Sequence, residues 1–337
     1  GYFGPLLCIH CLNMMKANFL LFGLSIFLTM TLSAAAFGAD ERHCTSVDMR
    51  EALGPNRDQG NMGWCYANTT ADLLSYRFRD ELRGERVSSG YIALAFNHTY
   101  FQEPNSEGGN VWLAAYMAQR EGVCLEDVEE KILSSGPRFK LKQKLSGLLY
   151  LKQHFDETGG QSLDGDLARY YGKYDSALLA MPRGDLSRLF KFSTRHNVAK
   201  KFADYMCRGQ KVYPDKVTST YVDSRWLYLG STRPLLLQIH HQLDLANIIG
   251  INYYADFFDY DNAPKTPEGR HASSIVGRRW NKEKKTCELL IRNSWGDRCT
   301  GYKAASLKEP GVCDKGNIWV SEKVLGQYLT SIVWLKK

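Results

Sequence analysis

Two apolar segments rich in β-branched residues, 272–280 and 286–292, lie on either side of a polar turn at 281–285. Such segments, joined by a short polar turn, predict a β-hairpin. A hairpin constrains the fold because its strands pair antiparallel, so the start of the first strand lies beside the end of the second. His271 precedes the first strand and Asn293 follows the second. The sequence therefore predicts that these two side chains lie next to each other.

A second pattern places a cysteine at the start of a helix. Residues 63–82 carry apolar side chains at spacings of three and four, which predicts an amphipathic helix. Cys65 lies at its N-terminal end, where the helix dipole favours a thiolate and lowers the thiol pKa. The alternative is a structural or disulfide-bonded cysteine, because most cysteines of exported proteins are paired.

His271 and Asn293 also have two interpretations each. A histidine at a strand edge after a long loop can serve as a general base facing a cleft, or it can be an ordinary surface or core residue. An asparagine amide can hold an imidazole in one tautomer, or it can simply end a strand. With Cys65, the three residues supply a nucleophile, a base and an orienting group.

The motifs DQGNMGWCYA at 58–67, Gly108-Gly109, HASSIVG at 271–277 and LIRNSWG at 290–296 occur in this order. Together they resemble the papain-like cysteine peptidases. The resemblance implies an α+β fold with two lobes and a cleft between them. The helical lobe would be built around the Cys65 helix, and the β-barrel-like lobe would carry His271 and Asn293.

The resemblance also implies a role for each site residue. Cys65 would be the nucleophile, His271 the general acid and base, and Asn293 the group that orients it. No cofactor and no metal ion would be needed. The substrate would be a peptide or protein, cleaved through an acyl-enzyme thioester by an endopeptidase or an exopeptidase.

Supporting roles follow from the same resemblance. Gln59 would donate its side-chain amide to an oxyanion hole, beside the backbone N–H of Cys65. Trp295 would cover the hydrogen bond between the asparagine and the histidine. Gly108 and Gly109 would leave a bare backbone edge on which a substrate peptide can pair in extended form.

The sequence departs from the family pattern at several positions. Met62 replaces a cysteine, so the usual first disulfide is missing or rewired, and Trp64 replaces a serine or alanine. We expect Trp64 to fill part of the cleft or to pack beneath it. His271 lies farther from Cys65 than the ~130–150 residues typical of the family. A basic stretch with helical pattern, 131–214, accounts for the excess and is predicted to be an insertion on the outside of the lobes.

These features predict four parts of the chain: a leader and signal peptide at 1–39, a helical lobe at 40–130, the insertion at 131–214 and a β-rich lobe at 215–337. Within them, we expect a further helix at 111–120. Short apolar runs predict strands at 235–239, 316–320 and 331–335. The tandem pair His240-His241 lacks a further residue at a ligand-like spacing, so it does not predict a metal site.

The N-terminal region is typical of a secretory signal: Lys16, an apolar run at 19–32, and small residues at 33–39. An uncleaved anchor helix is the alternative. Export predicts a secreted or periplasmic protein, or one of a lysosome-like compartment in a eukaryote. Seven cysteines follow the signal, so at least one thiol should be free. We expect that thiol to be Cys65, and we expect a disulfide between Cys299 and Cys313.

Composition excludes several classes. Apolar residues make up 44% and charged residues 23%, which is typical of a globular protein rather than a disordered, fibrous or polytopic membrane chain. A net charge of +7 without a dense basic block predicts no nucleic-acid partner. We expect a monomer with no integral membrane segment after signal cleavage. Two alternatives to a peptidase stay open: a non-catalytic relative that binds peptides or proteins, and a Cys-His hydrolase that acts on cell-wall peptides.

Overall fold

The structure is a computed structural model. It describes residues 41–101, 106–126, 140–160, 181–208, 210–214, 218–223, 231–262 and 268–336. The chain divides into two compact units, Gly1–His43 and Cys44–Lys337. In the first, only a short 3-10 helix, Glu41–His43, is described, so the predicted signal segment lies outside the described residues. The second unit contains the fold and the candidate site.

Cys65 begins helix α2 (Cys65–Arg77), which is followed in the chain by α3 (Ser89–Tyr100) and α4 (Val111–Glu121). The predicted helices at 63–82 and 111–120 correspond to α2 and α4, although α2 ends before residue 82. Side-chain caps at Ser88 and Asn110 accept hydrogen bonds from the first turns of α3 and α4. Helix α2 is buried on nearly every side, because it packs against α3 and α4 and also against the sheet.

The sheet is antiparallel, with strand order β2-β8-β3-β4-β5-β7-β6, and β1 pairs with β4 off this path. The strands are β1 (Val47–Asp48), β2 (Thr218–Asp223), β3 (Ile249–Tyr254), β4 (Arg270–Asn281), β5 (Thr286–Arg292), β6 (Cys313–Asp314), β7 (Asn317–Ser321) and β8 (Leu329–Lys336). The predicted hairpin is confirmed as β4 and β5, with Ser274 opposite Arg292. The strands predicted at 316–320 and 331–335 are confirmed as β7 and β8.

One predicted strand is wrong. Residues 235–239 belong to helix α11 (Arg233–Asp244), which begins with a proline in its first turn. Proline suits this position because the first helical residues need no intrahelical N–H donor. The buried side chains Leu235, Ile239 and Leu243 recur every four residues, so they form a helical stripe rather than a strand. The central strand β3, between β8 and β4, was not predicted.

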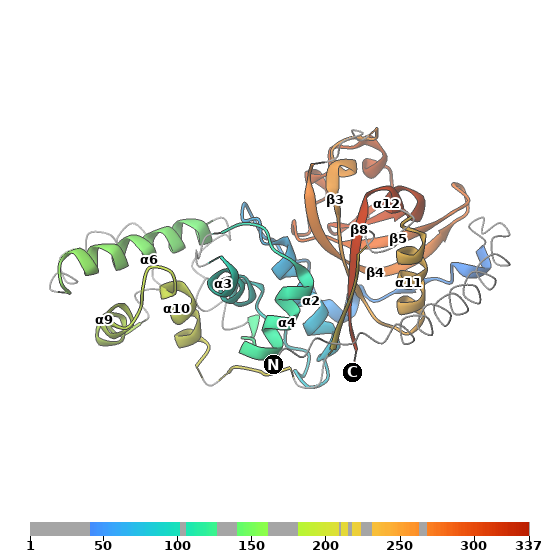
Figure 1. The fold of residues 1–337 in the computed structure, drawn as a ribbon. Coiled ribbons are helices and arrows are strands. Elements are labelled where there is room, and N and C mark those ends of the chain that lie inside the picture. The colour runs from blue at the N-terminus through green and yellow to red at the C-terminus, as the bar shows by residue number, and fades with distance from the viewer. Residues whose placement is uncertain are drawn as a thin grey trace, which may run out of the picture. The chain divides into compact units, whose positions relative to one another are not determined.

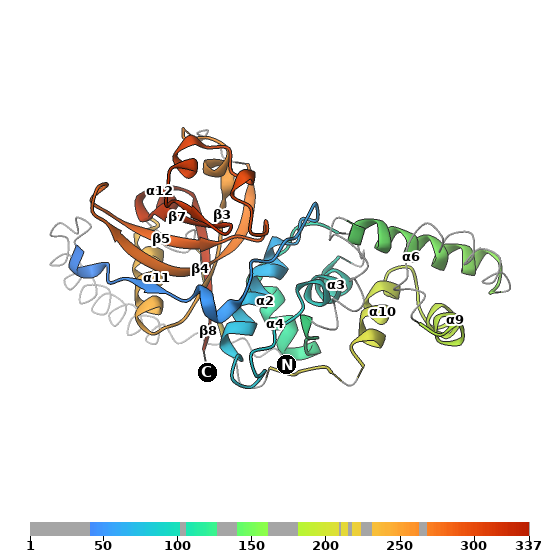
Figure 2. The same cartoon turned by 180° about the vertical axis from the view of Figure 1, so that it is seen from behind.

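The predicted α+β fold class is confirmed by these helices and this antiparallel sheet. In Figures 1 and 2, α2, α3 and α4 lie between the sheet and a second group of helices: α6 (Lys140–Glu157), α9 (Arg183–Lys191) and α10 (Val198–Met206). Helix α10 packs against α3 and α6. Leucine and phenylalanine side chains of this group join the hydrophobic core of α2–α4. The boundaries and role of the insertion at 131–214 stay predictions.

The other face of the sheet packs against α11 and α12 (Glu322–Tyr328) and forms a second core. Short 3-10 helices complete the fold at Arg50–Leu53, Ala255–Phe258, Cys299–Gly301 and Ala305–Lys308. Among the described residues, no helix combines the length and the apolar composition that crossing a membrane requires.

The described residues form three disulfides, Cys44–Cys287, Cys124–Cys207 and Cys299–Cys313, of which the first two join distant parts of the chain. The predicted Cys299–Cys313 bond is confirmed. Among the described cysteines, Cys65 is the one that carries a free thiol, as predicted.

The double variant Cys299→Ala/Cys313→Ala is expected to lose about 3 kcal/mol of unfolding free energy, because the bond closes a loop with a sequence separation of 14 and restricts the unfolded chain. Urea denaturation without reductant measures this loss. An unchanged midpoint would contradict the prediction.

Candidate active site

The first residue of α2 and the ends of the β4–β5 hairpin meet at one place. Cys65 begins α2, His271 lies at the start of β4, and Asn293 directly follows β5. Pairing of the hairpin strands places His271 Nε2 at 2.7 Å from Asn293 Oδ1. Because α2 packs against β4, the thiol of Cys65 reaches the ring of His271 and forms a side-chain hydrogen bond with it. The structure thus brings together the three residues predicted as nucleophile, base and orienting group.

The electrostatics of this pair favour its charged form. Burial by itself raises the pKa of the Cys65 thiol, but the charge and hydrogen bond of His271, with backbone hydrogen bonds from Ala272 and Tyr66, outweigh it and lower that pKa. Burial likewise lowers the pKa of His271, yet the Cys65 thiolate and the hydrogen bonds with Cys65 and Asn293 raise it overall. These opposite shifts favour a thiolate beside an imidazolium.

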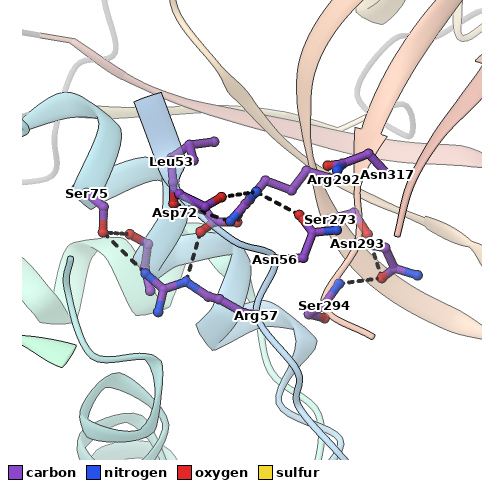
Figure 3. A network of polar contacts seen from close by, with 12 residues as sticks. Leu53, Asn56, Arg57, Asp72, Ser75, Ser273, Arg292, Asn293, Ser294 and Asn317 are labelled. Carbon is purple, nitrogen blue, oxygen red and sulfur yellow. Dashed lines mark hydrogen bonds and ion pairs between the residues drawn. The ribbon is translucent and has the colours of Figure 1, made fainter. Parts of the chain in front are cut away.

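Three hydrogen bonds fix the carbonyl oxygen of the Asn293 side chain. Besides the contact with His271, Oδ1 accepts from the backbone N–H of Ser294 at 2.8 Å and from Ser273 Oγ at 3.3 Å (Figure 3). A backbone N–H can only donate, so the amide must present its oxygen to this side. His271 therefore carries a proton on Nε2 in either charge state, and its Nδ1 side faces the thiol.

Trp295 lies against His271, with ring centroids 5.5 Å apart. It is half-buried and also contacts Phe258. The predicted cover of the His271–Asn293 hydrogen bond corresponds to this position, because an indole beside the imidazole limits the access of water.

Gln59 lies in the loop that leads to Cys65 and is held from both sides. Its backbone N–H donates to the carbonyl of Ser294 at 2.8 Å, and its side-chain oxygen accepts from Ser294 Oγ. Its Nε2 donates to the carbonyl of Met62 at 2.9 Å. An amide nitrogen has two N–H bonds, so one remains for the oxyanion role that the sequence predicted.

The segment that leads to Gly108 and Gly109 is anchored by the side chains of Trp64, which directly precedes α2, and Asn97 of α3. The carbonyl of Ser106 accepts one hydrogen bond from Trp64 Nε1 and one from Asn97 Nδ2, both at 2.9 Å. Trp64 is only 3% exposed, so it packs beneath the segment instead of filling the surface above Cys65. Trp64 thus supports the loop that contains Gly108 and Gly109.

The two glycines themselves are exposed. The backbone N–H of Gly108 donates to the carbonyl of Gly63 at 2.8 Å, which ties the segment to the loop before Cys65. Any side chain at position 109 would collide with the ring of Tyr66, 2.7 Å from a Cβ there. The close approach of an aromatic ring is the reason why this position needs glycine.

A buried cluster of ion pairs lies next to the residues of the candidate site. The sequence patterns did not predict this cluster. Asp72, on α2, binds Arg57 at 2.8 Å and Arg292 at 3.1 Å. Both arginines are 1–2% exposed. Figure 3 shows their side chains directed toward Asp72. Arg57 also pairs with Glu126 at 3.0 Å. Arg86 pairs with the carboxylate of Glu126 as well, at 2.8 Å.

The cluster fixes the backbone on both sides of the site. Arg57 precedes Asp58-Gln59, and Arg292 precedes Asn293. Arg292 also donates to the carbonyls of Gly54 at 3.0 Å and Pro55 at 2.6 Å. A charged residue inside the apolar run LLIRN was the signal in the sequence that could have indicated a buried partner.

One group of possible metal-ligating side chains occurs among the described residues, away from Cys65: His240, Cys287 and Glu322. Cys287 is bonded to Cys44, so its sulfur is not available as a thiolate ligand. His240 Nε2 lies 2.9 Å from Glu322 Oε2 and forms an ordinary ion pair or hydrogen bond with it.

Of the known proteins compared with this chain, solved structures match it and sequences do not. No family model and no curated protein sequence matches it. The Amb a 11 cysteine protease of ragweed pollen, in its proform, matches with 13% identity and a TM-score of 0.44, over 90% of this chain and 66% of that chain. A structure from work on the mite allergens Blo t 1 and Der p 1 matches with 13% identity and a TM-score of 0.47, over 91% and 74%.

The digestive procathepsin L 3 of Tenebrio molitor larval midgut matches with 15% identity and a TM-score of 0.45, over 90% of this chain and 72% of that chain. These neighbours are papain-like cysteine proteases, the family that the sequence motifs resemble. The chain spans about two thirds of the first neighbour's length.

Proposed function

We propose that this protein is an exported papain-like cysteine peptidase that hydrolyses peptide bonds through Cys65, His271 and Asn293. The observation that carries the proposal is one continuous set of contacts. A free thiol at a helix N-terminus is hydrogen-bonded to an imidazole, and the other nitrogen of that imidazole lies 2.7 Å from an amide oxygen. Nucleophile, base and orienting group in this order are the components of acyl transfer.

The reaction follows from the charges of the pair. The Cys65 thiolate attacks the carbonyl carbon of the substrate, and the carbonyl electrons move to oxygen to form a tetrahedral oxyanion. His271 gives its proton to the leaving amine, the C–N bond breaks, and a thioester remains on Cys65. Water then attacks the thioester, with His271 as the base that takes its proton, and the acid product leaves as the thiolate is restored.

Other residues complete the proposed site. The backbone N–H of Cys65 and the amide of Gln59 stabilise the oxyanion. The exposed backbone at Gly108 and Gly109 pairs with an extended peptide substrate, and its anchors beneath support it. The chemistry requires no cofactor and one copy of the chain. Three disulfides agree with export to an oxidising compartment.

Hydrolysis of unfolded casein, beside cell-wall peptide fragments, tests the proposal. Each assay is run with and without a thiol-directed epoxide. We expect cleavage of casein that the epoxide abolishes. Epoxide-sensitive cleavage of the cell-wall fragments alone would support the Cys-His hydrolase, and binding without cleavage of either would support a non-catalytic relative. Both of these results would overturn the proposal.

The variant Gln59→Ala is expected to lower kcat by about 10²–10³-fold with little change in KM, because an oxyanion donor acts on charge that develops only in the transition state. Modification of Cys65 by iodoacetamide should continue at a near-native rate, since His271 and the helix end are retained. Rates on a peptide ester or amide measure the first effect, and mass spectrometry measures the second.

Gln153→Ala is the matched control, because Gln153 is exposed on α6 and bonds only to its neighbour Glu157 in the contacts observed. Its rates should equal those of the wild type. Wild-type turnover by Gln59→Ala would show that Gln59 is not the oxyanion donor.

A further inference from the structure

A tyrosine beyond the motifs used so far reaches the asparagine of the site. Tyr302 directly follows the 3-10 helix Cys299–Gly301. It is 1% exposed. Its ring stacks on Trp295, with centroids 5.4 Å apart, and meets Phe258 at 5.2 Å. Its hydroxyl is therefore held in place among aromatic rings, behind Asn293.

Hydrogen bonds give this hydroxyl a defined direction. Asn293 Nδ2 donates to the Tyr302 oxygen at 3.2 Å, and the hydroxyl donates to the carbonyl of Gly316 at 2.9 Å. A phenol has one proton. Since the carbonyl of Gly316 can only accept, that proton points to it, and the lone pairs of the oxygen face the amide. Donation thus runs one way, from His271 through Asn293 and Tyr302 to Gly316.

We propose that Tyr302 is a positioning residue that holds the Asn293 amide with its oxygen toward His271. The proposal rests on the proposed function of the triad and adds a fourth side chain to it. Tyr302 touches neither the thiol nor the bond to be cleaved. It acts through Asn293, by accepting the hydrogen bond that the buried amide N–H would otherwise lack.

Loss of the Tyr302 hydroxyl would weaken the hold of Asn293 on His271. Burial raises the pKa of Tyr302 and exceeds the opposite influence of the bond from Asn293, so the hydroxyl keeps its proton. With phenylalanine at 302, the Asn293 N–H would remain buried without its acceptor, which is unfavourable. A flipped amide would set its N–H groups against the N–H of Ser294 and of His271. The amide would instead loosen and hold the imidazole less firmly.

The charges around His271 determine the sign of the pH effect. Its ionisable partner is Cys65, while Tyr253 packs edge-on at 5.7 Å and bonds to Ser273 Oγ. Burial raises the pKa of Tyr253, so this residue also stays neutral. The bond with Asn293 raises the pKa of His271. A weaker bond therefore lets the imidazolium lose its proton at lower pH.

The variant Tyr302→Phe tests the proposal because it keeps the ring and removes only the hydroxyl. We expect kcat to fall about tenfold with KM unchanged, less than the ~10²-fold of a full 1 Å misplacement. The alkaline limb of the pH profile for Cys65 alkylation reports the loss of the imidazolium proton from His271. We expect this limb to move to lower pH by roughly 0.3–1 pH unit, the equivalent of one ordinary hydrogen bond.

Tyr76→Phe is the matched control. Its hydroxyl also donates to a backbone carbonyl, that of Ala246 at 2.9 Å, but it lies near the far end of α2 from Cys65. It should leave both the kcat and the alkaline limb unchanged. An unchanged limb in Tyr302→Phe, or equal changes in both variants, would overturn the proposal.

A measurement on the wild-type protein covers the case in which Tyr302→Phe does not fold. The hydroxyl proton of Tyr302 should exchange slowly with solvent and show an NMR cross-peak to the side-chain amide of Asn293. A rapidly exchanging hydroxyl without that cross-peak would overturn the proposal. If the wild type cleaves no peptide, the proposed function fails, whereas the alkylation profile still decides whether Tyr302 acts on His271.

Discussion

Replacing Cys65 with alanine is expected to abolish peptide hydrolysis and thiol labelling together while the protein stays folded. The thiol is the nucleophile, so its removal leaves only the binding and oxyanion interactions. Loss of a nucleophile that acts with its base as a unit costs on the order of 10⁶-fold in kcat. Initial rates on casein and mass spectrometry after brief iodoacetamide treatment measure the two effects.

The labelling experiment is selective because the other described cysteines are in disulfides. In the wild type, the lowered pKa of Cys65 predicts that labelling continues below the ~8.5 at which an ordinary thiol is half ionised. The control is Ser146→Ala, a change at an exposed residue of α6, which should not affect either rate. Hydrolysis that survives in Cys65→Ala would refute the proposed mechanism.

Removal of Asp72 is the change expected to destabilise the fold most. Asp72→Ala leaves Arg292 and Arg57 buried without the carboxylate that they share. Breaking a buried ion pair from one side costs about 3–5 kcal/mol, because an uncompensated charge stays in a region of low polarity. Urea denaturation at neutral pH measures the loss of unfolding free energy.

The same group predicts how stability depends on pH. Burial raises the pKa of Asp72, but the charges of Arg292 and Arg57 outweigh it and lower that pKa overall. A carboxyl group with a lowered pKa in the folded state contributes its stability above the ordinary pKa of ~3.9, and this contribution is lost as the pH falls below it. Asp72→Ala should therefore show a weaker loss of stability upon acidification than the wild type.

Asp48→Ala is the matched control for Asp72→Ala. Asp48 pairs with Arg50 at the surface, where its side chain is 40% exposed. A surface ion pair contributes about 0–1 kcal/mol. If Asp72→Ala destabilises the protein no more than Asp48→Ala does, the buried cluster does not support the fold as described.

Local patterns predicted the parts of the site that depend on nearby residues. The β4–β5 hairpin follows from a short turn between two apolar runs, and it sets His271 beside Asn293. The start of α2 at Cys65 follows from helical periodicity. Both depend on interactions within about 25 residues, which sequence periodicity records.

The missed features depend on contacts between distant residues. Arg292 and Asp72 are separated by 220 positions, and no local pattern indicates their pairing. Tyr302 lies close to Asn293 in sequence, but its role depends on the carbonyl of Gly316 and on the rings around it. The apolar run at 235–239 was assigned to a strand because five residues cannot distinguish a strand from a buried helical stripe. The part boundaries and the leader at 1–39 stay predictions.

The disulfides have a consequence for the covalent integrity of the chain. Cys44 and Cys287 are bonded across a separation of 243 residues, so a single cut anywhere between them gives two fragments that stay covalently linked. A cut between Cys124 and Cys207 gives fragments linked twice. A two-chain form nicked in that region would therefore migrate as one species without reductant and as two with it.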